Sequence, residues 1–410
     1  MLSVEAALDR VLARIGVLGA ESVPLGAAHR RVLAESVVAG RELPSWDNSS
    51  MDGYAVRHVD TAGAAAARPV RLRVVGEIPA GAVAPRALDS GEVYRILTGA
   101  PMPAGADAVV PQEAVSRDGE AIVVTRPVKD GDFVRRRGED IRVGDDVLGP
   151  GDTLDPAALG VLAALGRPLV RVYQRPRVAI LSTGDELVDL DATPGPGQIP
   201  NSNSYTLAAQ VQEAGGVPVV LGIAPDDPGE LERRFRWGLS ADVLVSSAGV
   251  SVGDRDFIRE VLARLGAELD FWKVSMRPGK PMTFGTLGHR PVFGLPGNPV
   301  SSMVTFELFV RPALLKLGGH RALLRPRVRM PALGPMENPG ERRGYLRVRV
   351  VDEGQGPGVR LTGEQGSAIL VSMLRADGLA VLAPDSRVAP GETVEVILLR
   401  SDVASSFDEG

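Results

Sequence analysis

Residues 177–187, RVAILSTGDEL, begin as an apolar run of strand length and end in a loop that places a glycine beside two acids. After this stretch, strand-like apolar runs alternate with segments of helical length. The alternating segments are 203–216, 217–227, 241–249, 250–266, 291–297 and 298–319. Such alternation predicts a parallel sheet that is covered by helices on both faces. We therefore expect a doubly wound α/β domain over residues 176–320.

The segments on either side of this domain have other patterns. Apolar residues from Val4 to Ile15 follow helical spacing and Gly16 ends the run, which predicts one amphipathic helix. Short alternating runs, broken by glycine and proline, fill residues 43–140 and again 321–402. These runs are typical of short strands. We therefore expect a multidomain chain of the α/β plus β class.

One further helix is predicted just before the α/β domain. Asp155 stands at an N-cap position, Pro156 at the first helical position, and Gly166 beyond the end of an apolar run. Side-chain oxygens at the N-cap accept backbone N–H groups, and proline and glycine favour these two ends of a helix. A domain boundary is expected near Arg175.

Composition limits the size and class of the protein. At 410 residues the chain suggests about two to four domains. Cysteine is absent from the sequence, which excludes thiolate zinc sites, iron–sulfur clusters and cysteine nucleophiles. The four histidines lack the spacing of a zinc-binding pair. The net charge of −5, with acids and bases interleaved, argues against a nucleic-acid-binding surface.

The sequence also bears on location in the cell. Its apolar runs fall short of the roughly 18 residues that a membrane span needs. Its first residues carry acids where a signal peptide would carry a basic and then an apolar stretch. We therefore expect a cytoplasmic protein that has neither a membrane nor a nucleic-acid partner.

Loops at the carboxyl ends of the predicted strands are the candidate ligand site, because ligands of open α/β sheets bind there. They contain glycines that allow N–H groups to approach an anion, namely Gly184, Gly249, Gly253 and Gly297. They also contain acids, namely Asp185, Glu186, Asp226, Asp227, Asp254 and Asp256. Backbone donors beside carboxylates suit a phosphate that is bound through Mg²⁺. The alternative is that these polar residues only cap helices, as Asn298 could do in LPGNP.

Basic residues follow in FWKVSMRPGKP, where Lys273, Arg277 and Lys280 could bind an oxyanion or a second phosphate. A solvated basic face is the alternative. In the β-rich region, SSMDGYAVR places Asp52 in a segment that could equally be a simple Asp-Gly turn. The arginines of VRRRGED are expected to be surface charges, with Asp140 at their end kept as a candidate. Neither GxxxxGK[ST] nor GxGxxG spacing occurs, so a P-loop ATPase or a dinucleotide enzyme is not supported.

Taken together, these segments resemble the molybdopterin molybdenumtransferase family, which includes the bacterial enzyme and the E domain of gephyrin. The motifs that carry the resemblance occur in the family's order along nearly the whole chain. They are PSWDNSSMDGYAV, GEIPAG, YRILTGAPMPAGADAVVPQE, RGEDI, LSTGDEL, GQIPNSNSYTL, SSAGVSVGDRDF, KVSMRPGKP and VFGLPGNPVSS.

The resemblance implies an elongated subunit with four domains. They are a discontinuous extended or dimerisation domain (1–42 and 141–175), a β-rich inserted domain (43–140), a molybdopterin-binding α/β domain (176–320) and a C-terminal β-barrel (321–402). It also implies a cytoplasmic homodimer with its active site at the subunit interface. Such an enzyme takes molybdate and adenylated molybdopterin, inserts the metal with help from Mg²⁺, and releases AMP. Transient contacts with the adenylyltransferase and with molybdoenzymes are further expectations.

The resemblance and the loop positions together give the candidate site residues. The catalytic candidates are Asp52, which the partner subunit would contribute, Asp140, Glu186 and Asp256. The substrate-binding candidates are Thr98, Ser182, Thr183, Gly184, Asp226, Gly249, Ser251, Gly253, Lys273, Arg277, Lys280, Pro296, Asn298, Arg343 and Ser367. The Mg²⁺ candidates are Glu186, Asp226 and Asp256. Some family members have lysine at the position of Arg277, so the charge is kept there while its geometry differs.

Two other functions compete with this one. A molybdopterin adenylyltransferase would resemble only the α/β part of the chain, so the additional β domains argue against it. A gephyrin-like scaffold would use the barrel and the dimer to present a peptide groove. The acids and cations retained in the loops favour catalysis, and no sequence feature marks such a groove.

Overall fold

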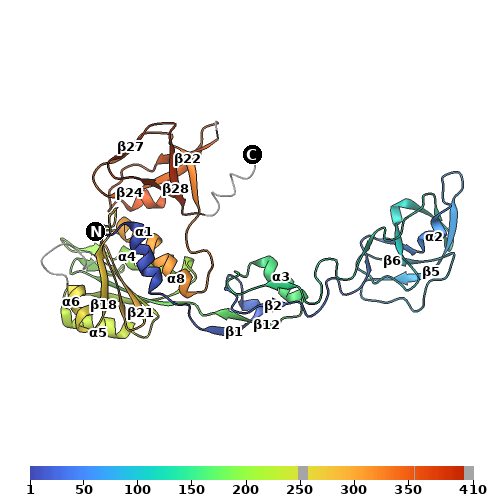
Figure 1. Cartoon of the computed structure of the whole chain (residues 1–410), viewed down its shortest axis with the longest axis horizontal. Coiled ribbons are helices and arrows are strands. Elements are labelled where there is room, and N and C mark those ends of the chain that lie inside the picture. The colour runs from blue at the N-terminus through green and yellow to red at the C-terminus, as the bar shows by residue number, and fades with distance from the viewer. Residues whose placement is uncertain (248–256, 355, 401–410) are drawn as a thin grey trace.

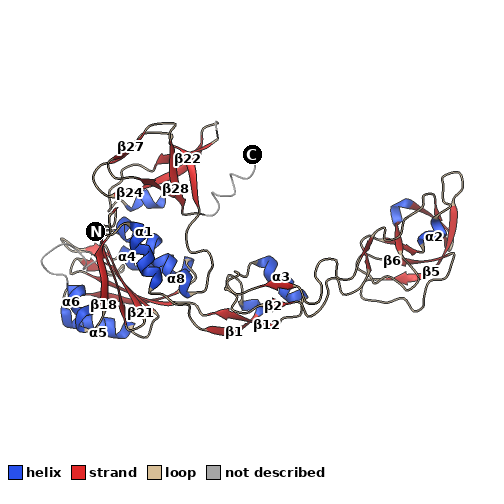
Figure 2. Ribbon diagram, viewed as in Figure 1, coloured by secondary structure: helices blue, strands red, loops and turns tan. Residues whose placement is uncertain are grey.

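The computed structural model describes residues 1–247, 257–354 and 356–400. Figure 1 shows an elongated chain, in which a large part formed by the α/β and C-terminal domains is joined through a slender middle part to a β-rich domain. Figure 2 shows that strands occur in every part. The multidomain arrangement of α/β and β parts is thus confirmed. Within the described ranges, every helix is too short or too polar to cross a membrane.

The β-rich domain is built on a six-stranded mixed sheet in the order β7-β4-β6-β5-β9-β8. Its elements are β4 (Gly53–Val56), α2 (His58–Thr61), β5 (Val70–Ile78), β6 (Glu92–Ile96), β7 (Ala108–Pro111), η2 (Gln112–Ala114), β8 (Val115–Asp118) and β9 (Ala121–Val124). Along β4, Tyr54 and Val56 face one apolar cluster while Ala55 faces another. This alternation follows from the two-residue period of a strand.

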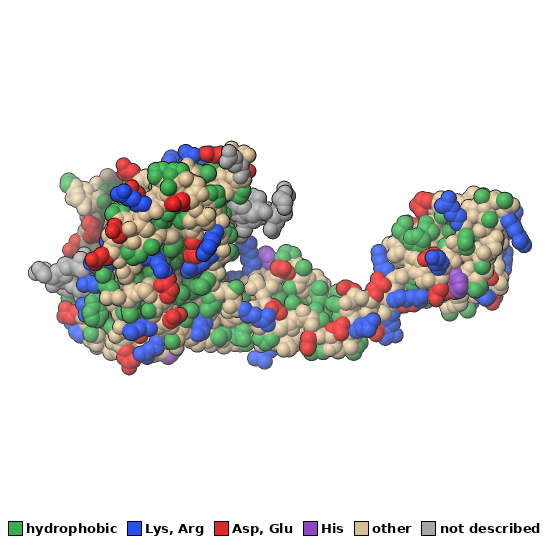
Figure 3. Space-filling model, turned by 45° about the horizontal axis from the view of Figure 1, so that its top comes forward, with side chains coloured by type: hydrophobic (Ala, Val, Ile, Leu, Met, Phe, Trp, Pro, Cys, Tyr) green, Lys and Arg blue, Asp and Glu red, His purple; other side chains and the backbone are tan. Residues whose placement is uncertain are grey.

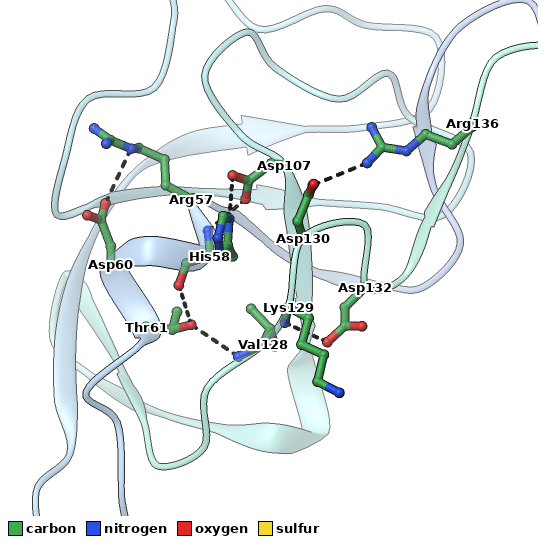
Figure 4. A network of polar contacts seen from close by, with 10 residues as sticks. All are labelled: Arg57, His58, Asp60, Thr61, Asp107, Val128, Lys129, Asp130, Asp132 and Arg136. Carbon is green, nitrogen blue, oxygen red and sulfur yellow. Dashed lines mark hydrogen bonds and ion pairs between the residues drawn. The ribbon is translucent and has the colours of Figure 1, made fainter.

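Polar contacts fasten helix α2 to the strands and to the segment that leaves the domain (Figure 4). His58 donates its backbone N–H to Asp107 Oδ1 at 2.6 Å, and its Nδ1 lies 2.7 Å from Asp107 Oδ2. Thr61 Oγ1 accepts the N–H of Val128 and donates to the His58 carbonyl. The helix and the return segment are therefore held as one unit.

The middle part is a small domain with its own apolar cluster. Its elements are β1 (Ala20–Pro24), η1 (Leu25–Ala27), β2 (Val37–Val38), β11 (Asp146–Leu148), α3 (Pro156–Ala164) and β12 (Leu169–Tyr173), and the short strands β3 (Asn48–Ser49) and β10 (Val134–Arg135) pair on the way to the β-rich domain. Helix α3 confirms the prediction from its punctuation: Asp155 Oδ1 accepts the Ala158 N–H at 2.8 Å, and Gly166 follows with a φ of +73°.

The α/β domain has the six-stranded sheet order β16-β13-β17-β21-β20-β18. The first four strands are parallel, and β20 and β18 add an antiparallel edge. Its elements are β13 (Arg177–Thr183), β14 (Leu187–Val188), β15 (Ile199–Pro200), α4 (Ser202–Glu213), β16 (Val217–Ala224), α5 (Pro228–Gly238), β17 (Val243–Ser247), α6 (Phe257–Arg264), β18 (Glu268–Lys273), β19 (Met276–Arg277), β20 (Pro281–Leu287), β21 (Arg290–Leu295), α7 (Pro299–Thr305), the π-helix η3 (Phe306–Val310) and α8 (Arg311–Leu317).

Both faces of this sheet are covered, as predicted. Val178 and Ile180 pack with residues of α4 and α7, while Ala179 and Leu181 pack with residues of α5 and α6. Every residue of β13 after Arg177 is therefore buried, which explains why the strand reads as a continuous apolar run. The expected doubly wound α/β domain is confirmed, with the antiparallel edge as an addition.

Helix α1 (Val4–Ala13) packs in a place that the sequence did not indicate. It begins at Ser3, whose Oγ accepts the Ala6 N–H, and it buries Val4, Ala7 and Val11 in the same cluster as the strands of the α/β sheet. We expected residues 1–42, together with 141–175, to form the extended domain. The packing differs because the apolar stripe of α1 is covered by the α/β core. The domain boundaries otherwise stay a prediction.

The C-terminal domain is a curved antiparallel sheet. Its elements are β22 (Arg327–Pro331), β23 (Met336–Asn338), β24 (Arg343–Asp352), β25 (Pro357–Leu361), α9 (Leu370–Leu374), β26 (Gly378–Leu382), β27 (Ser386–Val388) and β28 (Thr393–Leu398). The sheet order is β19-β24-β26-β28-β22, with β25 on the edge of β24. An isolated bridge joins Ala332 to Val359. This single bridge between the two edges of the sheet does not confirm the closed barrel that we expected.

Strand β19 joins the two large domains, because it belongs to the α/β segment of the chain but pairs with β24.

On the face drawn in Figure 3, acidic and basic side chains are interspersed over the domains without a continuous patch of one sign. This distribution agrees with the interleaved charges of the sequence.

Candidate active site

A pocket of about 590 Å³ lies at the carboxyl ends of the α/β strands, where the ligand loops were expected. Glu186, Pro296 and Asn298 line it, and Ala368 of the C-terminal domain contributes one wall. In the sheet, β13 lies between β16 and β17, so successive strands are added on opposite sides of the first one. Ligands of open α/β sheets bind in the crevice that such a reversal creates.

A cluster of buried polar side chains holds the strand ends beside this pocket. Ser182 Oγ lies 3.1 Å from Asn201 Oδ1, 2.9 Å from Ser204 Oγ and 3.1 Å from Ser247 Oγ. All four residues are buried. The cluster joins the ends of β13 and β17 to the start of α4.

Several buried polar atoms near the strand ends have no hydrogen-bond partner in the described part of the chain. They include Asn203 Oδ1, Thr183 Oγ1 and Ser246 Oγ. Asn203 lines the pocket, and its Nδ2 donates to the Gly297 carbonyl at 2.8 Å. Buried polar atoms without a partner are rare in native structures, so this grouping suits a polar ligand.

Sequence reasoning listed Ser182 and Thr183 but missed the polar residues around them. The missed residues are Asn201, Asn203, Ser204, Ser246 and Ser247. A signal was present for some of them, because the run NSNS at 201–204 puts small polar side chains at the first turn of a helix. We took the run as part of a family motif and of a predicted helix, without selecting its side chains as site residues.

Three carboxylates lie close together at the ends of β13 and β16. The Asp226 N–H donates to Asp185 Oδ1 at 3.1 Å. Burial raises the pKa of Asp226, and the negative charges of Asp185 and Glu186 raise it further. Gly184, with a φ of +141°, allows the Glu186 carboxylate to approach so closely that a Cβ would collide with it. Nevertheless, the described residues contain no group of three acids or histidines arranged as metal ligands.

The predicted cations lie at the end of β18, in β19 and immediately before β20. Lys273 pairs with Pro281 across the two strands, and the Val274 N–H donates to the Lys280 carbonyl. Arg277 Nη1 donates to the Pro339 carbonyl at 3.4 Å. In the described ranges, no acid forms an ion pair with Lys273 or Lys280, so both ammonium groups are available to an anion.

Beside Ala368, which lines the pocket, Ser367 of the C-terminal domain contacts the pocket residue Asn298. Asn298 Nδ2 donates to Ser367 Oγ at 3.1 Å, and the Val300 N–H donates to the Ser367 carbonyl at 3.1 Å. Asn298 occupies the N-cap position of α7, but its side chain does not cap the helix. It reaches the neighbouring domain instead, which the simple capping alternative did not include.

Two neighbouring arginines have different partners. Arg343, which we expected near molybdate, forms an ion pair with Glu5 of helix α1. Arg342 Nη1 donates to the Met276 carbonyl at 3.3 Å and so contacts the segment that carries Arg277. Sequence reasoning selected Arg343 and missed Arg342, since the two adjacent arginines cannot be told apart by type.

Asp52 and Thr98 meet each other in the β-rich domain. Asp52 Oδ1 accepts the Thr98 N–H at 2.8 Å and the Thr98 hydroxyl at 2.7 Å. These two bonds lower the pKa of the exposed Asp52 carboxyl. Asp140 is exposed, and its N–H donates to the Leu43 carbonyl on the path between domains. Within one chain this domain lies far from the α/β domain (Figure 1).

The remaining predicted residues, Gly249, Ser251, Gly253 and Asp256, lie outside the described residues. Their proposed contacts with substrate and Mg²⁺ therefore stay predictions.

Comparison with known proteins covers the chain almost from end to end. Residues 2–166 match the MoeA N-terminal region (domain I and II), 179–316 match a probable molybdopterin binding domain, and 329–399 match the MoeA C-terminal region (domain IV). A molybdopterin molybdenumtransferase of Nostoc sp. is 41% identical, over 92% of this chain and 88% of its own length. That of Synechococcus elongatus is 37% identical, over 97% and 99%.

A solved structure agrees with these matches. The molybdopterin biosynthesis MoeA protein of Pyrococcus horikoshii aligns with a TM-score of 0.84 and 32% identity, over 97% of this chain and all of that one. Similarity of this extent includes the β-rich, middle, α/β and C-terminal parts together. The chain therefore belongs to the molybdopterin molybdenumtransferase family.

Proposed function

We propose that this enzyme inserts molybdenum from molybdate into adenylated molybdopterin and releases AMP, as a step of molybdenum cofactor biosynthesis. Support comes from the family's match to all parts of the chain and from the curated relatives of that name. The observation that carries the proposal is the pocket itself. It is lined by Glu186, one of the crowded carboxylates, by Asn298, which contacts Ser367 of the C-terminal domain, and by Pro281, which follows Lys280 in the chain.

Electrostatics explains why cations are needed there. Molybdate is a divalent oxyanion, and bringing it to an anionic dithiolene costs about 4 kcal/mol per unit-charge pair at contact in a medium of intermediate dielectric. Lys273, Arg277 and Lys280 would offset this repulsion. Ser367 Oγ accepts its bond from Asn298, which leaves its O–H free to donate to an oxyanion. Arg343 remains a candidate for the same role, in competition with its bond to Glu5.

The charge of the carboxylate cluster is the part of the site that a divalent cation would offset. The pKa of Asp226 is raised partly because Asp185 and Glu186 repel its charge, and a cation would relieve that repulsion. We propose that Glu186 and Asp226, together with Asp256, hold Mg²⁺. When bound, the ion would neutralise charge on the pyrophosphate of the adenylated substrate. The Gly184 N–H already donates to the Ala224 carbonyl at 3.3 Å, so other backbone N–H groups at the strand ends would orient that pyrophosphate.

Asp52 enters the proposal through a second subunit. Its domain is remote from the pocket of the same chain, so we propose a homodimer in which each Asp52, held by Thr98, reaches the partner's pocket. Asp140 would support it from the same domain. We also propose that the C-terminal sheet closes as a barrel, that the enzyme is cytoplasmic, and that it contacts the adenylyltransferase and molybdoenzymes transiently.

Molybdate-dependent release of AMP from adenylated molybdopterin tests the proposed reaction directly. Lys273→Ala should weaken molybdate binding in calorimetry while sparing the adenylated pterin. Arg236→Ala on α5, which removes a positive charge that pairs with Glu232, is the matched control. Equal loss of both ligands in Lys273→Ala would contradict the assignment of Lys273 to molybdate.

Mixing two inactive variants tests the shared site. Asp52→Ala and Lys273→Ala should each lack activity, whereas mixed dimers contain one intact site. After random exchange of subunits, about a quarter of the wild-type activity should return, because half the dimers are mixed and each has one working site of two. If no activity returns although mixed dimers form, the two residues do not meet across the subunit interface.

A further inference from the structure

Strand β24 has two faces with different surroundings. Leu346 and Val348 belong to the core of the C-terminal domain, while Tyr345 belongs to the cluster that this domain shares with the α/β domain. Arg347 lies on the same face as Tyr345, because side chains alternate along a strand. Its exposed fraction is 0%. A completely buried arginine therefore lies where the two large domains meet.

Arg347 has no carboxylate partner among the described residues. Its Nε donates to Ser372 Oγ at 3.1 Å and its Nη2 donates to the Gly366 carbonyl at 3.0 Å. Burial lowers the pKa of Arg347 to about 10, and the positive charge of Arg277 adds to the effect. A buried charge without an opposite charge is unfavourable unless fixed hydrogen bonds compensate it. The bonds to residues 366 and 372 are therefore a specific feature of this site.

The backbone of Arg347 is bound to the same loop. Gln365 Oε1 accepts the Arg347 N–H at 2.8 Å, Gln365 Nε2 donates to the Arg347 carbonyl at 3.2 Å, and the Thr362 N–H donates to that carbonyl at 3.0 Å. Strand β25 ends at Leu361, so the loop takes over the edge of β24 that β25 leaves. The main chain of Arg347 thus holds the start of the 362–366 loop at Thr362, and its side chain holds the end of the loop at Gly366.

Ser367 follows immediately and contacts Asn298 and Val300 at the pocket. We propose that Arg347 is a positioning residue, which fixes the 362–366 loop and thereby holds Ser367 against Asn298 and Ala368 in the wall of the anion pocket. The ligand in that pocket rests on the proposed function, whereas the effect on the loop does not.

Hydrogen exchange on the full-length protein tests the positioning. In Arg347→Met, amides of residues 362–368 should exchange about tenfold faster while those of β26 and β28 stay protected. Ser372→Ala removes the acceptor of Nε and keeps the charge, so it should show the same local change more weakly, and it serves if Arg347→Met does not fold. Arg327→Gln, which removes the charge that pairs with Glu395 in the same domain, is the control. Unchanged exchange at 362–368 in Arg347→Met, or in Ser372→Ala if only that variant folds, overturns the proposal.

Calorimetry with sodium molybdate tests the consequence at the pocket. Arg347→Met should weaken binding about tenfold, the effect of losing roughly one charge-assisted hydrogen bond. Arg347→Lys should restore only a small part, because an amine cannot make both bonds in the guanidinium geometry. In a Ser367→Ala background, Arg347→Met should have little further effect. If the losses of molybdate affinity caused by Arg347→Met and Ser367→Ala multiply in the double variant, Arg347 acts independently of Ser367, and the proposal is overturned. Absence of molybdate binding by the wild type would instead contradict the proposed function and leave the exchange result standing.

Discussion

The hydroxyl of Ser182 should be worth more to stability than its size suggests. In Ser182→Ala, Asn201 Oδ1 still accepts the Ser204 N–H, and Ser204 Oγ still accepts from Asn201 Nδ2. Ser247 Oγ, however, loses the one side-chain bond that the described residues give it. A buried hydroxyl left without a partner costs about 1–3 kcal/mol. We therefore expect the free energy of unfolding of the α/β domain to fall by about 2 kcal/mol.

The double variant makes this reasoning refutable. Ser247→Ala leaves Ser182 with two other partners, so it should cost only about 1 kcal/mol. In Ser182→Ala/Ser247→Ala no hydroxyl is orphaned, and the combined loss should stay near about 2 kcal/mol rather than the sum of about 3 kcal/mol. Additive losses would show that the unpartnered Ser247 hydroxyl is not the cause of the Ser182 effect.

Tryptophan fluorescence during urea unfolding can follow this domain alone. Of the three tryptophans, Trp237 and Trp272 lie in the α/β domain and Trp46 lies outside it. Trp46 is about half exposed, so Trp46→Phe provides a background with little expected structural change. Ser116→Ala on an exposed position of β8 is the control and should leave the transition unchanged.

Three other predictions concern charge and helix capping. Asp226→Asn should raise the melting temperature at pH 7, and the gain in free energy of unfolding should be less than about 1 kcal/mol because solvent screens the repulsion from Asp185 and Glu186. Since the pKa of Asp226 is raised, this gain should shrink as the pH falls and the wild-type carboxylate is protonated. A gain that does not depend on pH would contradict this prediction. Burial raises the pKa of Tyr345 to about 12, so its neutral form contributes stability below pH 10 that is lost as the pH rises toward 12. Urea titrations at several pH values should show that the free energy of unfolding falls more steeply with pH for the wild type than for Tyr345→Phe. Equal dependence on pH in the two proteins would be inconsistent with this prediction. Asp155→Ala should cost about 1 kcal/mol and speed hydrogen exchange in α3, whereas unchanged exchange there would argue against the cap.

Patterns that act within one element predicted the structure well. The N-cap Asp155, the helix of Val4 to Ile15 and the strands of the α/β domain all depend on spacing over a few residues, and these elements formed as predicted. The carboxyl-end loops were also located correctly, because sheet topology places them together whatever their detailed sequence. The acid cluster of Asp185, Glu186 and Asp226 follows from this rule.

Contacts between domains could not be predicted in the same way. Asn298 has the sequence position of a helix cap, and only the presence of Ser367 across the domain boundary gives its side chain another partner. Likewise, the stripe on α1 predicts burial without saying against which domain. Amphipathic patterns specify that a face is covered, while the covering surface is chosen by packing between segments far apart in the sequence.

The two arginines before and at the start of β24 make the consequence clear. Adjacent residues on an extended chain point to opposite sides, so a shift of one position decides which guanidinium meets Glu5 and which meets the Met276 carbonyl. No local signal separates Arg342 from Arg343. Which of the two side chains contacts the α/β segment at Met276 therefore depends on how β24 pairs with β19. Substitutions along that contact should alter anion binding even where they spare every loop of the α/β domain.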